Sequence, residues 1–286
     1  MTVAFHVNIT RNNAYEVAVA VYNELVSLGI DVIIIDDVRD SFSELDAEFL
    51  PIKEAVSKCD VLVAVGGDGT IIHSAHYAAE QDKPILGINA GRLGFLAGVE
   101  KEELSLLKNL IDGNYLIDKR MMLSVKHYEN DELIKEYFCL NDVVVARGAS
   151  MHMCEIDASD NGRRISAYIA DGLIIATPTG STAYSLSAGG PVVDTSIESL
   201  ILTPVCSHSV LTRSMIFKPD SQIEISVRNS ETSCPIFSCD GENGIEMNNN
   251  SKLVVTRAER VTKIIRIKSD SFSDILTHKL IERYGY

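Results

Sequence analysis

The chain has 286 residues, 46% of them apolar, and a formal net charge of −14. This length allows one large domain or two of ordinary size, and the apolar fraction is normal for a globular protein with a substantial core. The negative charge argues against nonspecific nucleic-acid binding and against attraction to anionic membranes. It does not exclude an anionic substrate, because a few local cations are enough to make a site.

Six cysteines are scattered along the chain without a Cys-x-x-Cys pair, which disfavours a zinc ribbon and a thioredoxin-type redox motif. We expect most of them to be reduced core residues of a cytoplasmic protein. The N-terminus has no basic segment followed by an apolar core, so we expect no signal peptide. No apolar run approaches the length that spans a membrane.

The first 113 residues alternate between short apolar runs and helical patterns. Strands are expected at residues 3–9, 30–35, 61–65 and 84–88, and helices at about 12–28, 51–59, 70–80 and 101–111. Gly29 and Gly113 are expected to end the first and the last of these helices. This alternation predicts a doubly wound parallel sheet in an α/β domain over residues 1–114.

After Gly113 the pattern changes to short strands with polar connections. We expect strands at residues 116–128, 133–145, 153–158, 164–170, 201–205, 222–227, 253–257 and 262–267. Many short strands at close spacing predict a β-rich, antiparallel sandwich-like domain over residues 115–269. Residues 270–286 return to helical spacing, and we expect this helix to join the first domain.

Residues 60–70 read Asp-Val-Leu-Val-Ala-Val-Gly-Gly-Asp-Gly-Thr, an apolar run that ends in a glycine-rich turn. The pattern predicts a strand-to-helix turn at the carboxyl end of a parallel sheet, where open α/β folds bind ligands. Glycines let the chain turn tightly, and the first amides of a helix suit a phosphate. Asp68 would repel phosphate. It therefore holds a metal, accepts a proton from an attacking hydroxyl, or is simply a turn residue.

Residues 171–191 form a second unusual stretch, in which hydroxyl-bearing and small residues surround Pro178 and Gly180. Such residues can cap a helix or donate hydrogen bonds to a ligand. Tyr184 either presents its ring to a flat heterocycle or is a core residue. A third patch, Asn141-Asp142, can bracket ribose hydroxyls or an adenine edge, although the same pair is common in turns.

Together these stretches resemble the NAD kinase family over nearly the whole chain. The resemblance rests on Gly66-Gly67-Asp68-Gly69-Thr70, Asn141-Asp142, Asp171-Gly172, Thr177-Pro178-Thr179-Gly180-Ser181-Thr182-Ala183-Tyr184 and Asp240-Gly241. Diacylglycerol-type lipid kinases share the first of these motifs, whereas the eight-residue run is far more specific. The resemblance implies an N-terminal α/β domain, a β-rich C-terminal domain, and transfer of the ATP γ-phosphoryl group to the 2′-hydroxyl of the adenosine ribose of NAD.

The resemblance also implies roles for individual residues, with Asp68 as the proton acceptor. The expected substrate-binding residues are Gly69, His73, Asn141, Asp142, His152, Asp171, Thr179, Ser181, Thr182, Ala183, Tyr184, Ser185, Leu186, Ser187 and Glu242. The expected phosphate contacts are Gly66, Gly67, Thr70 and Arg92. No protein metal ligand is expected, and Mg²⁺ or another divalent cation is expected to arrive with ATP.

The expected substrates are NAD and ATP, or polyphosphate in place of ATP. In the family a neighbouring subunit completes the NAD site, so a homo-oligomer, either a dimer or a tetramer, is implied. The chain departs from the family pattern at four positions. Asp142 stands where Glu is usual, Glu242 where Gln is common, His73 where Arg is frequent, and Ile169 where some members carry Arg or Lys. The last three departures leave the expected site less cationic.

Some alternatives stay open at this point. A lipid kinase would share the glycine turn, but the acidic net charge and the lack of an amphipathic membrane segment disfavour it. A non-catalytic NAD(P) sensor of the same fold would have no need of the Asp68 carboxylate. His152 is either a ligand contact or an alternating polar residue of a strand, and His73 is either a substrate contact or a residue on a solvated helix face.

Overall fold

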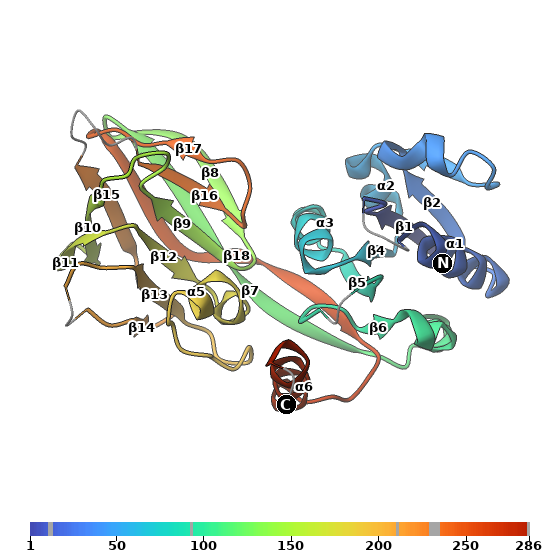
Figure 1. Cartoon of the computed structure of the whole chain (residues 1–286). Coiled ribbons are helices and arrows are strands. Elements are labelled where there is room, and N and C mark those ends of the chain that lie inside the picture. The colour runs from blue at the N-terminus through green and yellow to red at the C-terminus, as the bar shows by residue number, and fades with distance from the viewer. Residues whose placement is uncertain (11–13, 92–93, 210–211, 229–234, 285–286) are drawn as a thin grey trace. The chain divides into compact units, whose positions relative to one another are not determined.

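The computed structural model describes residues 1–10, 14–91, 94–209, 212–228 and 235–284, with side chains up to residue 278. The chain divides into two compact units, Met1–Lys119 with Arg260–Tyr286, and Arg120–Glu259. Two long strands, β7 (Leu116–Glu129) and β18 (Ser251–Arg266), contribute residues to both units (Figure 1).

The sheet of the first unit confirms the predicted doubly wound parallel architecture. Its strands are β1 (Thr2–Val7), β2 (Asp31–Ile35), β3 (Glu48–Leu50), β4 (Val61–Gly66) and β5 (Pro84–Asn89). They lie in the order β3-β2-β1-β4-β5, and all neighbours are parallel. The strand β5 also pairs in parallel with β6 (Val99–Glu100) and with β18. Every residue of β4 is buried, as expected for a strand covered on both faces.

The helices of this unit follow the predicted order. They are α1 (Ala14–Ser27), α2 (Ile52–Lys58), α3 (Asp68–Glu80), α4 (Lys108–Asp112) and α6 (Phe272–Tyr284), with short 3₁₀ helices at η1 (Asp36–Ser41) and η2 (Lys101–Leu107). Gly29 and Gly113 follow α1 and α4 with left-handed φ angles of 74° and 68°, as predicted. The single helix expected at 101–111 is instead a kinked 3₁₀ segment followed by α4, because Glu103 leaves helical geometry.

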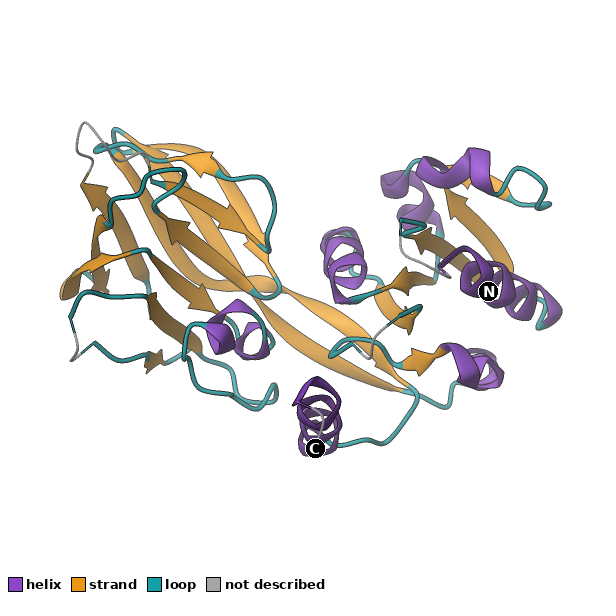
Figure 2. Cartoon of the chain, in the orientation of Figure 1, coloured by secondary structure: helices purple, strands orange, loops and turns teal. Residues whose placement is uncertain are grey.

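The second unit consists mainly of antiparallel strands (Figure 2). One sheet holds β11 (Arg163–Ala170), β10 (Cys154–Asp160), β15 (Ile223–Arg228) and β18, together with β7 and β8 (Glu132–Cys139). The other has the order β14 (Met215–Phe217), β13 (Leu200–Val205), β12 (Gly172–Ala176), β9 (Asp142–Ala146), β16 (Ile236–Cys239) and β17 (Ile245–Glu246). Apolar residues from both sheets share one core, as in a sandwich.

Three strand predictions need correction. The expected strand at 133–145 is two strands, β8 and β9, which belong to different sheets. The two strands expected near the C-terminus are one continuous strand, β18. Residues 172–176, which lie in the stretch not expected to be a strand, form β12, which pairs with both β9 and β13. In the part of the chain that the structure describes, no helix is long and apolar enough to cross a bilayer.

Candidate active site

The glycine-rich turn joins β4 to α3, as the sequence predicts. Gly67 precedes the helix in an extended conformation, with φ of −99° and ψ of −177°. The glycine at position 66 is needed for space, because a Cβ atom there would lie 2.4 Å from Thr70 Oγ1. Gly69 differs, since an added Cβ would meet no atom of the chain within 4 Å and the residue is exposed. The turn is therefore closed on its inner side and open at Gly69.

The carboxylate of Asp68 is held by a loop distant in sequence. Phe95 N donates a hydrogen bond to Oδ2 at 2.9 Å, and Leu96 N donates to Oδ1 at 3.1 Å. The loop approaches so closely that a Cβ at Gly94 would lie 2.3 Å from Asp68 Oδ1. Asp68 is thus fixed in position by contacts beyond its own turn.

In the second unit, one carboxylate organises the Asn141-Asp142 patch. The side chain of Asp240 accepts hydrogen bonds from Leu140 N at 2.6 Å, Asn141 N at 2.8 Å and Asp142 N at 3.0 Å. Asp240 and Gly241 have φ angles of 48° and 76°, and Glu242 N donates to Cys239 O at 3.0 Å, which is the pattern of a tight hairpin turn. Asp240-Gly241 is therefore both a turn and an anchor for the segment between β8 and β9.

Asp142 is only 5% exposed, and its carboxyl group lies in an acidic environment. Burial, followed by the charge of Asp240, raises the pKa of Asp142 from its ordinary value of 3.8 to about 7. Near neutral pH this carboxyl group therefore populates both a form that donates a hydrogen bond and a form that only accepts.

The Thr177–Tyr184 run packs directly on this patch. Thr177 N donates to Asn141 O at 2.8 Å, and Thr177 Oγ1 donates to Leu140 O at 2.6 Å. Gly180 must lack a side chain, because a Cβ there would lie 2.2 Å from Asn141 O. Two motifs separated by more than thirty residues in sequence are thus joined by their backbones.

Most hydroxyls of the run are used inside the fold. Ser181 Oγ donates to Pro178 O at 2.6 Å, Ser185 Oγ lies 2.9 Å from Thr203 Oγ1, and the buried Arg120 donates to Thr179 Oγ1 at 3.2 Å. Short helices at η3 (Gly180–Thr182) and α5 (Tyr184–Ser187) follow. Tyr184 is 47% exposed, so it is not a core residue. Thr182 is buried, Ala183 and Leu186 are half-buried, and Ser187 is exposed.

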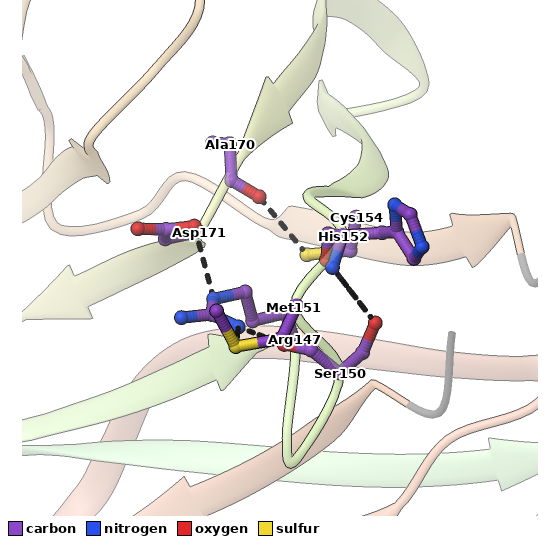
Figure 3. Close-up of polar contacts among 7 residues, drawn as sticks. All are labelled: Arg147, Ser150, Met151, His152, Cys154, Ala170 and Asp171. Atoms are coloured by element: carbon purple, nitrogen blue, oxygen red, sulfur yellow. Dashed lines mark hydrogen bonds and ion pairs between the residues drawn. The ribbon is translucent and has the colours of Figure 1, made fainter. Parts of the chain in front are cut away.

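A third group of polar residues surrounds Asp171 (Figure 3). Arg147 Nε lies 3.0 Å from Asp171 Oδ1, and the same guanidinium also donates to Ser150 O. His152 is exposed and lies in the loop before β10, so the alternative that it is an alternating polar residue of a strand does not hold. Its ring points away from the ion pair in Figure 3, while its backbone amide donates to Ser150 Oγ at 3.0 Å.

For two expected site residues, the structure gives no side-chain contact that bears on their expected role, and two arginines near the site were not expected from the sequence. Glu242 is exposed and its backbone closes the hairpin turn, while Arg92 lies outside the described residues. Sequence reasoning missed Arg147 and Arg120. Gly172 of β12 pairs with Ala146 of β9, and this pairing brings the next residues, Arg147 and Asp171, side by side. No local pattern in the sequence predicts which residues of two strands pair.

The described residues contain no group of three or more His, Cys, Asp or Glu side chains arranged to hold a metal ion.

His73 lies on α3, exposed, beside a cavity of about 370 Å³ that also borders Gly69 and Thr70. The first unit therefore brings together Asp68, the glycine turn and His73. The second brings together Asn141, Asp142 and residues 177–187.

Comparisons with known proteins agree over almost the whole chain. A model of the ATP-NAD kinase N-terminal domain matches residues 3–115, and a model of the ATP-NAD kinase C-terminal domain matches residues 140–267. The NAD kinase of Caldanaerobacter subterraneus subsp. tengcongensis is 41% identical over 80% of this chain and 81% of its own. That of Natranaerobius thermophilus is 32% identical over 96% of this chain and 95% of its own.

Solved structures give the same result. The chain resembles the yeast NADH kinase crystallised with NADH, with a TM-score of 0.89 and 25% identity over 100% of this chain and 89% of that one. An Archaeoglobus fulgidus NAD kinase in complex with ATP shares the fold, with a TM-score of 0.76 and 24% identity over 98% of both chains. Given two matching family models and such identities over most of both sequences, the chain belongs to the NAD kinase family.

Proposed function

We propose that the chain transfers the γ-phosphoryl group of ATP to the 2′-hydroxyl of the adenosine ribose of NAD, with Asp68 as the proton acceptor. The activity rests on family membership. The observation that carries the role of Asp68 is its position, since the amides of Phe95 and Leu96 fix the carboxylate beside the open Gly69. Phosphoryl transfer depends mainly on such positioning and on charge neutralisation.

In the proposed reaction, the ribose oxygen forms a bond to the γ-phosphorus as the bond from that phosphorus to the β,γ-bridging oxygen breaks. The hydroxyl proton passes to an oxygen of Asp68, and ADP leaves. Gly66, Gly67 and Thr70 shape the turn whose helical amides face the transferring group. Mg²⁺ or another divalent cation enters as part of the ATP substrate, because such an ion keeps several waters and binds substrate phosphates instead of a dedicated all-protein cage.

We assign phosphate binding to residues 1–114 with 270–286, and NAD binding to residues 115–269. Asn141 and Asp142 suit the adenylate hydroxyls, because Asp240 and Thr177 hold their backbones in place. The exposed ring of Tyr184 suits stacking on a heterocycle. The exposed His152, Ser187 and Glu242 are free of core packing, which is compatible with ligand contact.

We further propose that the chain is a homo-oligomer, a dimer or tetramer, in which a neighbour completes the NAD site. Exposed apolar side chains on the second unit support this proposal. Met151 is 86% exposed, Ile216 56% and Ile169 49%. Light scattering during size-exclusion chromatography at assay concentration should give a multimer, and a fully active monomer would refute it. Location in the cytoplasm stays a prediction.

The decisive experiment supplies purified protein with NAD and γ-labelled ATP and follows the label into NADP. Polyphosphate as the alternative donor and diacylglycerol as the alternative acceptor are tested in parallel. Label in NADP at a rate proportional to protein concentration supports the proposed reaction. Label in lipid would support the lipid kinase alternative, and NAD binding without turnover would support a sensor.

A further inference from the structure

The loop between β9 and β10 is attached at both of its ends to the connection between β11 and β12. Asp171 is the one residue between those two strands. At the start of the loop, Arg147 N donates a hydrogen bond to Asp171 O at 3.0 Å. At its end, Cys154 pairs with Ala170, and Cys154 Sγ donates to Ala170 O at 3.3 Å. The backbones of the loop and of Asp171 are therefore fixed relative to each other.

The side chain of Arg147 makes a second connection between the same two segments (Figure 3). Its Nε lies 3.0 Å from Asp171 Oδ1, while Nη1 donates to Ser150 O and lies 4.0 Å from Met151 Sδ. Ser150 N donates to Arg147 O at 3.3 Å, so residues 147–150 turn around the arginine itself. Because a guanidinium is planar with its donors in a fixed fork, holding one nitrogen orients the others. The loop thus directs Nε at the carboxylate.

The ion pair is open to solvent on part of its surface. The side chain of Arg147 is 29% exposed and that of Asp171 37%. A pair with this exposure contributes little to the stability of a fold, whereas its carboxylate can be reached by a ligand. Ile169, two residues before Asp171, is apolar. Within the described residues, the positive charge that contacts the Asp171 carboxylate is therefore that of Arg147.

We propose that Arg147 is a positioning residue for NAD binding, which acts by orienting the carboxylate of Asp171 and by compensating its charge. The proposal rests on the proposed function, since Asp171 is a substrate-binding residue by its resemblance to the family. NAD carries a negatively charged diphosphate, and an uncompensated carboxylate would repel it. ATP binding is assigned to the other unit, so Arg147 should affect NAD and leave ATP unaffected.

Two substitutions of Arg147 test the proposal. Arg147→Met removes the charge and the polar contacts but keeps a long side chain. We expect it to raise the KM for NAD roughly three- to tenfold, between the effects of losing an exposed and a buried charged contact, with the KM for ATP unchanged. Arg147→Lys keeps the charge without the planar fork and should recover part of the NAD affinity.

The matched control is Arg164→Met, which removes another arginine of the same unit. Arg164 Nη2 lies 3.6 Å from Asp157 Oδ1, so this variant also breaks a partly exposed arginine–aspartate pair. Both KM values should stay at the wild-type level. An unchanged KM for NAD in Arg147→Met, or an equal rise of both KM values, would overturn the proposal.

A double-mutant cycle shows whether Arg147 acts through Asp171. Asp171→Asn should raise the KM for NAD by itself. In the Asp171→Asn background, Arg147→Met should raise that KM by less than about twofold further, because the group that the arginine positions is already altered. If the two effects multiply instead, Arg147 acts independently of Asp171 and the proposal is wrong.

A readout without turnover is the binding of NAD to the full chain, measured by calorimetry in the absence of ATP. Arg147→Met should weaken this binding by a factor similar to that in KM. Light scattering accompanies each titration, and we expect the oligomeric state to be that of the wild type. Weaker binding together with a changed oligomeric state would overturn the positioning role in favour of a role in assembly. Should Arg147→Met fail to fold, Arg147→Gln is judged by the same criteria.

The two proposals fail differently. If NADP forms normally but Arg147→Met binds NAD as the wild type does, the role of Arg147 is wrong and the proposed reaction stands. If no NADP forms while Arg147→Met still weakens the calorimetric binding of NAD, the proposed reaction is wrong and the positioning role stands.

Discussion

Asp240 and Asp142 are joined by two hydrogen bonds through the backbone of Asp142. Asp142 N donates to Asp240 Oδ1 at 3.0 Å, and Asp142 O accepts from Asp240 N at 2.9 Å. Asp240 thereby positions the segment that carries Asn141 and Asp142. It also brings its own charge close to a second, buried carboxyl group.

We predict that Asp240→Asn raises the KM for NAD by roughly tenfold or more, because an amide cannot accept all three backbone hydrogen bonds. The loss of charged hydrogen bonds should also lower the free energy of unfolding by roughly 1.5–3 kcal/mol. Steady-state kinetics and urea denaturation measure the two effects. The control is Asp220→Asn, which removes an exposed carboxylate paired with Lys218. Unchanged KM values in Asp240→Asn would remove its positioning role.

A second prediction concerns pH. Because folding raises the pKa of Asp142 from 3.8 to about 7, the folded state binds the proton more tightly than the unfolded state. The stabilisation from this proton is full below the unfolded pKa and is lost as pH rises through the folded pKa. Relative to Asp142→Asn, the wild type should lose on the order of 2–3 kcal/mol between about pH 5 and pH 8.

This loss is measured as the difference between urea-denaturation free energies of the two proteins at each pH, so that other titrating groups largely cancel. Asp240 and Cys139 are titratable neighbours of Asp142, and both are present in both proteins. A difference that does not change with pH would show that Asp142 stays charged throughout.

Asp68→Asn should lower kcat by roughly 10²–10⁴-fold, the usual effect of losing a general base. The amide keeps the shape of the carboxylate but loses one of its two backbone hydrogen bonds, so NAD binding, followed by calorimetry, should fall far less than kcat. Asp60→Asn is a suitable control, since Asp60 precedes β4 and accepts a hydrogen bond from Thr2 N. Near-normal turnover of Asp68→Asn would reduce Asp68 to a structural residue.

Two of the three glycines of the turn, Gly66 and Gly69, should respond to alanine in opposite ways. Gly66→Ala should destabilise the fold, because its Cβ would clash with Thr70 Oγ1. Gly69→Ala meets no atom of the chain and should leave the free energy of unfolding equal or raise it by up to about 1 kcal/mol. Its kcat/KM should nevertheless fall, since the methyl group would occupy space for the substrates. A fully active Gly69→Ala would argue against close ligand approach.

Tyr184→Ala should raise the KM for NAD roughly tenfold to a hundredfold and leave the KM for ATP nearly unchanged, as the loss of one stacking contact predicts. Because the ring is 47% exposed, the melting temperature should change little. Tyr184→Phe keeps the ring and should retain most of the NAD affinity. Parallel rises of both KM values with a collapsed melting temperature would instead indicate a packing role.

The sequence by itself determined the order and type of most elements in the first unit. Apolar runs such as 61–65 are local patterns, and a parallel sheet buried on both faces leaves that pattern in each strand. The position of the glycine turn could also be predicted from a short segment, because it depends on the conformation of a few neighbouring residues. The same holds for Gly29 and Gly113, which follow the ends of helices. Family motifs then placed Asp68 and Asn141-Asp142 in a functional context.

The tertiary structure alone decided which of these residues meet. Asp240 binds amides about a hundred residues away, and Arg147 reaches Asp171 through the register of β9 and β12. The split of 133–145 into β8 and β9 belongs here too, because no glycine or proline separates the two halves and the split is defined by their different pairing partners. Strand register and long-range hydrogen bonds depend on the packing of the whole unit, so no local periodicity contains them.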